Sequence, residues 1–208
     1  MFSSSITLTP YKPKNPEKDW KIRATHDTAS WAERNNFDFL GFYTIHYGTM
    51  RNFMTAWKSR EKSKYLCQYI IRNGGLTVIV RDIITIFENE IELTTSNTKD
   101  SNLLPKPLGE YSQSFSKCSF DELYRNHREA EEFLIARGGA KEDKSEIDFE
   151  EHFIGSLKKE NRYHWKHWYG IFFILYFYFV RRNRWHNKSI KEQYELGMIK
   201  LPNEIFIK

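Results

Sequence analysis

Five segments rich in β-branched and aromatic residues follow one another between residues 38 and 95. Such residues suit the pleated, half-buried surface of a sheet. The segments are DFLGFYTI, MRNFMTAW, KYLCQYII, LTVIVRDIITIF and EIELTT. Asn73, Gly74 and Gly75 separate the third from the fourth, and these residues accept the positive φ that a tight hairpin requires. The pattern predicts an antiparallel meander of four or five strands.

A helix is predicted after these strands, over residues 120–137. Ser119 and Glu122 form a capping-box pattern, in which each side chain bonds to the backbone N–H of the other residue. Apolar residues then recur at helical spacing until Gly138 and Gly139, which favour a helix C-terminus. The sequence thus predicts an α+β fold, in which an antiparallel sheet of four to five strands is packed by an amphipathic helix.

Residues 168–180 read WYGIFFILYFYFV and contain no charged side chain. As a helix they rise about 20 Å, whereas a bilayer core is about 30 Å thick, so a full span requires residues 163–167 as well. The flanking Trp and Arg residues are typical of a membrane interface. We expect a membrane-contacting helix over residues 163–185, as a single-pass transmembrane helix, with an in-plane or re-entrant helix and buried soluble structure as alternatives. The residues expected at the membrane are Trp165, Trp168, Tyr169, Phe172, Phe173, Leu175, Phe177, Phe179, Arg181, Arg182 and Trp185.

The net charge of +5 is unevenly placed along the chain. Residues 1–157 carry 21 Lys and Arg against 23 Asp and Glu, whereas residues 158–208 carry 11 against 4. This basic region indicates an anionic partner. Membrane lipid is the expected partner and another protein is an alternative. Nucleic acid is not expected, because its binding surface must stay wet and the run IFFILYFYF is apolar.

The sequence predicts five consecutive regions. The first residues lack a basic start followed by an apolar core, so they do not read as a signal peptide. We therefore expect a membrane localisation with the N-terminal domain in the cytoplasm. The regions are an extended arm and short helix (1–37), an α+β soluble domain (38–140), a charged linker and amphipathic helix (141–162), the membrane-contacting helix (163–185) and a basic tail (186–208).

Two groups of residues have the spacing of a chemical site on a helix. Glu160, His164 and His167 share one helical face, as zinc or iron ligands do, but no fourth ligand can be named. His127 and Glu131 are four residues apart, which suits a general acid–base pair or an ordinary hydrogen bond. Neither pattern is complete, so no metal and no cofactor are expected.

The two cysteines, Cys67 and Cys118, are too few for a disulfide framework. Cys118 precedes the predicted helix, where a helix N-terminus would lower its pKa, so it is the better candidate nucleophile. The sequence contains no G-x-S-x-G, P-loop, G-x-G-x-x-G or H-E-x-x-H motif. These absences argue against the standard hydrolases, nucleotide-binding folds and zincins.

Residues 95–118 are rich in turn-forming residues and predict a long loop. A loop of this length is either functional or fixed by its own side chains. The run ELTTSN followed by LLPKPLGEYSQSF resembles uncharacterised bacterial membrane-associated proteins in which TTSN and P-x-P-x-G-x-Y precede a helix. The resemblance covers residues 91–115 and implies no activity. The candidate binding residues of this region are Thr94, Thr95, Ser96, Asn97 and Tyr111.

Three functions are compatible with these features. The first is a membrane-anchored, non-enzymatic binding or scaffold module. The second is an enzyme with a site formed by loop 95–118 and the sheet. The third is a nucleic-acid-binding module that uses the basic aromatic region 158–188.

Overall fold

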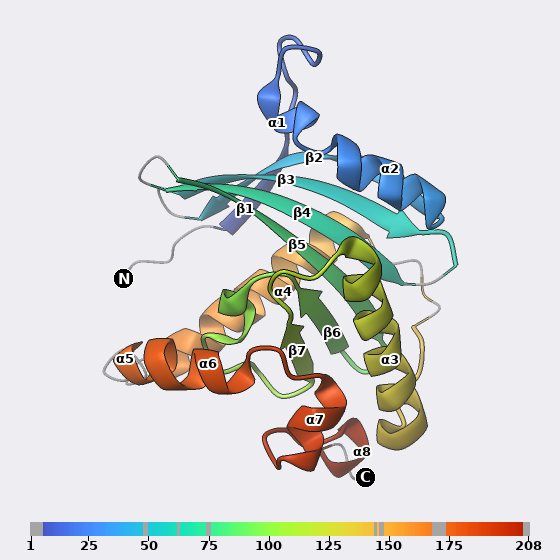
Figure 1. Ribbon diagram of the computed structural model, residues 1–208, viewed down its shortest axis with the longest axis vertical. Coiled ribbons are helices and arrows are strands. Elements are labelled where there is room, and N and C mark those ends of the chain that lie inside the picture. The colour runs from blue at the N-terminus through green and yellow to red at the C-terminus, as the bar shows by residue number, and fades with distance from the viewer. Residues whose placement is uncertain are drawn as a thin grey trace.

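The computed structural model describes residues 6–205, apart from residues 48, 49, 62, 74, 75, 144, 146, 147 and 168–173. A mixed sheet of seven strands forms its centre, with the strands in sequence order (Figure 1). Neighbouring strands are antiparallel, except that the last two are parallel. The strands are β1 (Ile6–Pro10), β2 (Phe37–Tyr47), β3 (Met50–Ser59), β4 (Lys64–Asn73), β5 (Leu76–Phe87), β6 (Ile91–Ser96) and β7 (Glu110–Ser114).

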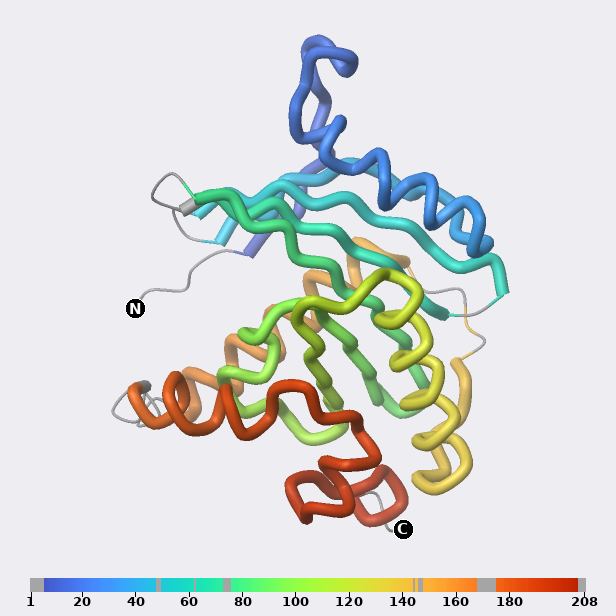
Figure 2. Tube along the Cα trace, viewed as in Figure 1, coloured from blue at the N-terminus to red at the C-terminus, as the bar shows by residue number. Residues whose placement is uncertain are grey.

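Helices lie between the strands along the chain and follow the last strand (Figure 2). A short 3-10 helix, η1 (Lys99–Asn102), lies between β6 and β7, and a π-helical turn, η3 (Phe177–Arg181), lies between α5 and α6. The α-helices are α1 (Trp20–Arg23), α2 (His26–Arg34), α3 (Phe120–Gly138), α4 (Phe149–Lys166), α5 (Ile174–Tyr176), α6 (Arg182–Trp185), α7 (Ile190–Glu195) and α8 (Pro202–Ile205).

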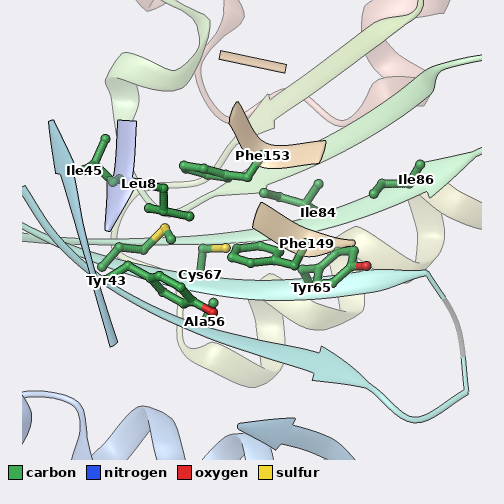
Figure 3. Packing of buried hydrophobic residues seen from close by; sticks show 11 residues of the cluster. Leu8, Tyr43, Ile45, Ala56, Tyr65, Cys67, Ile84, Ile86, Phe149 and Phe153 are labelled. Atoms are coloured by element: carbon green, nitrogen blue, oxygen red, sulfur yellow. The ribbon is translucent and has the colours of Figure 1, made fainter. Parts of the chain in front are cut away.

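The sheet is the middle of three layers. On one face α2 and α3 pack through Trp31 and Leu123 against Trp57 and Ile83 of the sheet. On the other face α4 packs through Phe149 and Phe153, which lie one helical turn apart. Figure 3 shows the rings of these two residues among aliphatic and aromatic side chains of β1 to β5. Because successive strand residues point to opposite faces, β2 to β5 each supply both layers of the core.

The prediction of an antiparallel sheet of four to five strands is wrong. The five predicted segments correspond to β2 to β6, but β1 lies in the expected arm, β7 lies in the expected loop, and the β6–β7 pair is parallel. The sequence does not predict β1 because the strand ends in Pro10, which has no N–H to donate to a neighbouring strand. β1 is an edge strand, and an edge strand tolerates proline because one of its sides has no partner strand. β7 was missed because its sequence, EYSQS, is mostly polar.

The prediction of a helix after Ser119 is confirmed. Ser119 and Glu122 make both hydrogen bonds of the capping box. Gly139 ends the helix with φ 68°, a left-handed conformation that glycine adopts without steric strain. Asn73 and Leu76 are paired across the β4–β5 hairpin, whereas the two glycines predicted to form its turn lie outside the described residues.

The prediction of a single-pass transmembrane helix is also wrong, and so is the membrane localisation that was based on it. Within the described residues, no helix has the length and the apolar character needed to cross a membrane. The apolar run is divided: Trp165 lies in α4, which ends at Lys166, and the later residues lie in α5, η3 and α6. The helical stretch 174–185 rises only about 18 Å, which is less than the thickness of a bilayer core, about 30 Å. Of the residues expected at the membrane, Trp168, Tyr169, Phe172 and Phe173 lie outside the described residues, whereas Leu175, Phe177, Phe179, Arg181, Arg182 and Trp185 lie in this short helical stretch.

An ion pair joins the helical stretch 174–185 to η1. Arg182 Nε lies 2.7 Å from Asp100 Oδ1 on η1. After it, the C-terminal residues Ile190 and Leu201 are fully buried in a cluster with Leu134 of α3. The region predicted as a basic tail therefore contributes side chains to the core.

Two helical glycines predict opposite effects of the same substitution. A Cβ on Gly138 would lie 2.7 Å from Cδ of Pro202, a rigid ring on α8, whereas a Cβ on Gly155 meets no atom within 4 Å. We expect Gly138→Ala to lower the free energy of unfolding by about 1–3 kcal/mol. Gly155→Ala should raise it by about 0.5–1 kcal/mol, because alanine loses less conformational freedom in a helix. Urea denaturation followed by circular dichroism measures both, and a change of the same sign in the two variants would contradict the packing described.

Candidate active site

An open cleft of about 550 Å³ lies between α4 and the first residues of β6 and β7. A smaller cavity of about 110 Å³ continues from it under α4 and reaches Asp82 on β5. Both spaces are lined by Glu92, His152 and Ser156. The larger cleft is lined in full by Glu90, Glu92, Glu110, His152, Gly155, Ser156, Lys158, Lys159 and Arg162.

The parallel pairing of β6 and β7 places two carboxylates side by side. Glu92 and Glu110 are register partners on these strands. Adjacent strands are about 4.8 Å apart, and register partners point to the same face of a sheet. Here that face is the one covered by α4, because both residues line the cleft beside it.

Glu92 is tied to α4 by two hydrogen bonds. His152 Nε2 and Ser156 Oγ each lie 3.2 Å from Glu92 Oε2, one helical turn apart. Thr94 Oγ1 donates to the other carboxylate oxygen at 3.3 Å. Burial alone would raise the pKa of Glu92, but the bond and charge of His152, together with Lys106 and Ser156, lower it below its ordinary value. Glu92 is therefore held as a carboxylate.

Glu110 has the opposite environment. Its side chain is 9% exposed, and its buried Oε1 accepts no hydrogen bond. The nearest cation, Lys159 Nζ, lies 3.9 Å away. Burial and the neighbouring charge of Glu92 raise the pKa of Glu110 to about 7. Glu110 can therefore hold or release a proton near neutral pH.

Asp82 lies deeper, in the smaller cavity. Its Oδ1 is buried and accepts no hydrogen bond. Burial raises the pKa of Asp82 to about 6, although Ser96 and Lys106 lower it in part. Lys106 is itself held by Glu160 on α4, with Nζ 2.7 Å from Oε1.

Cations line the mouth of the cleft. Lys158 and Lys159 lie on one turn of α4, and Arg162 lies on the next. Gly155 lies on the same lining and has no side chain to fill the space. The cleft thus combines positive charge at its mouth with two carboxyl groups at its base. Glu92 is ionised, and Glu110 has a pKa of about 7. Such a pair supplies a general acid and a base in one place.

The predicted binding residues lie on both faces of the sheet. Thr94 and Ser96 face α4, where Thr94 lines the smaller cavity and Ser96 bonds to Asp82. Thr95 faces α3 and contacts His127, with 2.8 Å between Oγ1 and Nδ1. Asn97 bonds to the backbone of Arg81, and Tyr111 donates to the carbonyl of Lys200 at 2.9 Å. The structure therefore brings only Thr94 and Ser96 to the candidate site.

The residues with metal-ligand spacing do not converge. Glu160 pairs with Lys106, His164 Nε2 lies 3.0 Å from the carbonyl of Pro105, and His167 Nδ1 lies 2.8 Å from the carbonyl of Tyr163. Among the described residues, no group of three or more His, Cys, Asp or Glu side chains is arranged to hold a metal ion.

His127 and Glu131 form part of a buried structural network. Thr85 and Thr95 contact the two ring nitrogens of His127 at 2.9 and 2.8 Å. Lys64 Nζ lies 2.7 Å from Glu131 Oε2, and Thr85 donates to the other oxygen. Burial lowers the pKa of His127, which stays neutral and fully enclosed. A substrate cannot reach this pair.

The two thiols are not activated. Cys67 is fully buried between β-strands, and burial raises its pKa. Cys118 donates to the carbonyl of Phe115 at 3.1 Å. Burial raises the pKa of Cys118 too, so the lowering expected from the helix N-terminus is wrong.

Little in the sequence predicts the acidic cleft. Glu92 and Glu110 are 18 positions apart and share no motif, so their proximity depends on a parallel pairing that was not predicted. Alternation along the segment EIELTT groups Glu92 with Glu90 and Thr94, on the side opposite Ile91 and Leu93, so the pattern does not indicate that Glu92 is covered by a helix.

Comparison of the chain with protein-family models, curated proteins and solved structures finds no match. The resemblance of residues 91–115 to uncharacterised bacterial proteins stays a prediction.

The raised pKa of Glu110 predicts a pH-dependent stability difference. The native protein holds the proton of Glu110 up to about pH 7, against 4.5 for the unconstrained group, so this stabilisation is complete below 4.5 and is lost as the pH rises through 7. Glu110→Gln stays neutral throughout. Its free energy of unfolding should match that of the unaltered protein at pH 4 and exceed it above pH 7 by up to about 3 kcal/mol.

Urea denaturation at a series of pH values measures this difference. Glu129→Gln, on the exposed surface of α3, is the matched control and should give a constant difference across the series. A constant difference for Glu110→Gln as well would show that Glu110 is ionised like an ordinary surface carboxylate.

Proposed function

We propose that the protein is an enzyme that performs general acid–base chemistry on a small anionic substrate bound in the acidic cleft. One observation carries the proposal. Glu92 and Glu110 are register partners at the base of the cleft, and their environments push their pKa values in opposite directions. Pairs of this kind identify the acid and the base of many active sites.

Each group in the cleft has a role in this proposal. Lys158 and Arg162 at the mouth attract and orient the anionic group of the substrate. Glu110 donates a proton to the reacting group, and Glu92 accepts one or stabilises positive charge. His152 is a positioning residue, because its bond to Oε2 fixes the carboxylate of Glu92. The volume of about 550 Å³ suits a small molecule.

A non-enzymatic module that binds a small anion is the second candidate. It uses the same cleft, and one feature favours it: the carboxylate of Glu92 already accepts bonds from His152, Ser156 and Thr94. Binding without turnover distinguishes this candidate from the enzyme.

Substitution of Gly155 tests whether the cleft binds a ligand. A side chain at this position meets no protein atom and enters the open space. Phosphate, citrate and glucuronate serve as probes, and their binding is followed through the NMR amide shifts of residues 155–159. Gly155→Leu should fold normally and weaken probe binding at least tenfold, whereas Gly155→Ala leaves most of the volume free and should retain it. Equal binding by the two variants, or no binding of any probe at millimolar concentration, would refute a ligand site here.

Proton transfer by Glu110 predicts a loss of activity at alkaline pH. A panel of anionic chromogenic substrates, p-nitrophenyl phosphate and p-nitrophenyl glucuronide among them, identifies a turnover reaction. Its kcat/KM should fall as the pH rises through about 7, because Glu110 then loses the proton that it donates. Glu110→Gln should reduce kcat/KM about 10²–10⁴-fold, while Glu129→Gln leaves it unchanged. Turnover that Glu110→Gln retains would exclude Glu110 as the acid, and probe binding without any turnover would favour the binding module.

A further inference from the structure

A second cavity, of about 360 Å³, lies between the segment that leads into β7 and the C-terminal helices. Cavities of this size with a mainly apolar lining hold small molecules when a few polar groups fix the orientation. The cavity is distinct from the acidic cleft, although Glu110 lines both. Its apolar wall includes Pro105, Pro107, Leu108, Tyr111, Trp185 and Met198.

Gln193 of α7 also lines this cavity and carries an unpaired acceptor. The side chain is fully buried, and its Nε2 donates to the carbonyls of Ser112 and Lys188, both at 3.0 Å. These two bonds fix the orientation of the amide. The remaining oxygen, Oε1, is buried and has no donor. A buried acceptor without a partner destabilises the folded protein, so its retention calls for an explanation.

Asn102 and Arg181 supply two unpaired donors to the same cavity. Asn102 ends η1 and is 1% exposed, and its Nδ2 has no acceptor. It lies near Gln193, because Ser112 Oγ donates to the carbonyl of Ser101 at 3.5 Å while the carbonyl of Ser112 holds Gln193. The buried Nε of Arg181 also has no acceptor, and its guanidinium carbon lies 4.1 Å from the ring centroid of Trp185.

Two unpaired donors and one unpaired acceptor, on three residues that line one cavity, match a particular ligand chemistry. We propose that this cavity binds a nucleoside-sized molecule carrying a cyclic imide, the hydrogen-bonding group of uracil-type rings. An imide presents a carbonyl, an N–H and a second carbonyl along one edge, which complements Asn102, Gln193 and Arg181. The proline and aromatic wall suits the faces of a flat ring. This inference is independent of the proposed chemistry in the acidic cleft.

Uridine and 3-methyluridine provide the test. The two nucleosides differ only at the imide nitrogen. Methylation there removes the N–H that would donate a hydrogen bond to Gln193 Oε1. Isothermal titration should show saturable 1:1 binding of uridine and at least tenfold weaker binding of 3-methyluridine. Asn102→Leu removes an unpaired donor and should weaken uridine binding to a similar extent. Gly155→Leu, which alters only the acidic cleft, should leave it unchanged.

The opposite results would overturn the inference. Equal affinity for the two nucleosides would show that the imide is not read, and no binding of uridine at millimolar concentration would show that the cavity does not take this class. Loss of uridine binding in Gly155→Leu would place the nucleoside in the acidic cleft. The nucleoside comparison uses the unaltered protein, so it decides the question even where Asn102→Leu fails to fold.

Discussion

The parallel pairing of β6 and β7 is the constraint on which the candidate active site depends. Antiparallel neighbours can be joined by a tight turn, whereas parallel neighbours need a crossover of about a dozen residues. The segment between Ser96 and Glu110 makes that crossover, and it aligns Glu110 with Glu92 at the start of β6. Antiparallel pairing would instead place Glu110 near Ser96, at the other end of the strand. The same crossover carries Lys106 to α4 and forms one wall of the second cavity.

Helix α4 completes the site because it carries two adjacent stripes of different character. Phe149 and Phe153, one turn apart, pack into the apolar core over β1 to β5. His152, Ser156 and Glu160 follow the same four-residue spacing on the neighbouring stripe, and they meet the acidic residues and Lys106. The apolar stripe therefore fixes the helix on the sheet, and this places the polar stripe over Glu92.

Much of the fold was predictable where a local signal decides it. The strands β2 to β6 follow from their β-branched and aromatic content, and α3 follows from the capping box of Ser119 and Glu122. β1 and β7 carry no such signal, because their pairing is decided by distant partners. The run 168–180 misled the prediction because apolar composition does not specify helix length, and α4 ends at Lys166. The site was predictable only as a region, since the loop 95–118 contains Glu110 but nothing in it indicates Glu92.

Two buried polar clusters in this protein differ in whether their groups have hydrogen-bond partners, and this difference distinguishes a structural cluster from a candidate site. In the cluster of Lys64, Thr85, His127 and Glu131, each charged or polar group has a partner, so burial is compensated and the cluster fixes α3 on the sheet. Under α4, Asp82 and Glu110 each keep a buried oxygen without a hydrogen bond. Selection for stability alone would remove such groups, since apolar replacements of similar shape cost nothing or stabilise. Their position beside an open, cation-lined cleft is the arrangement expected of a binding or catalytic role.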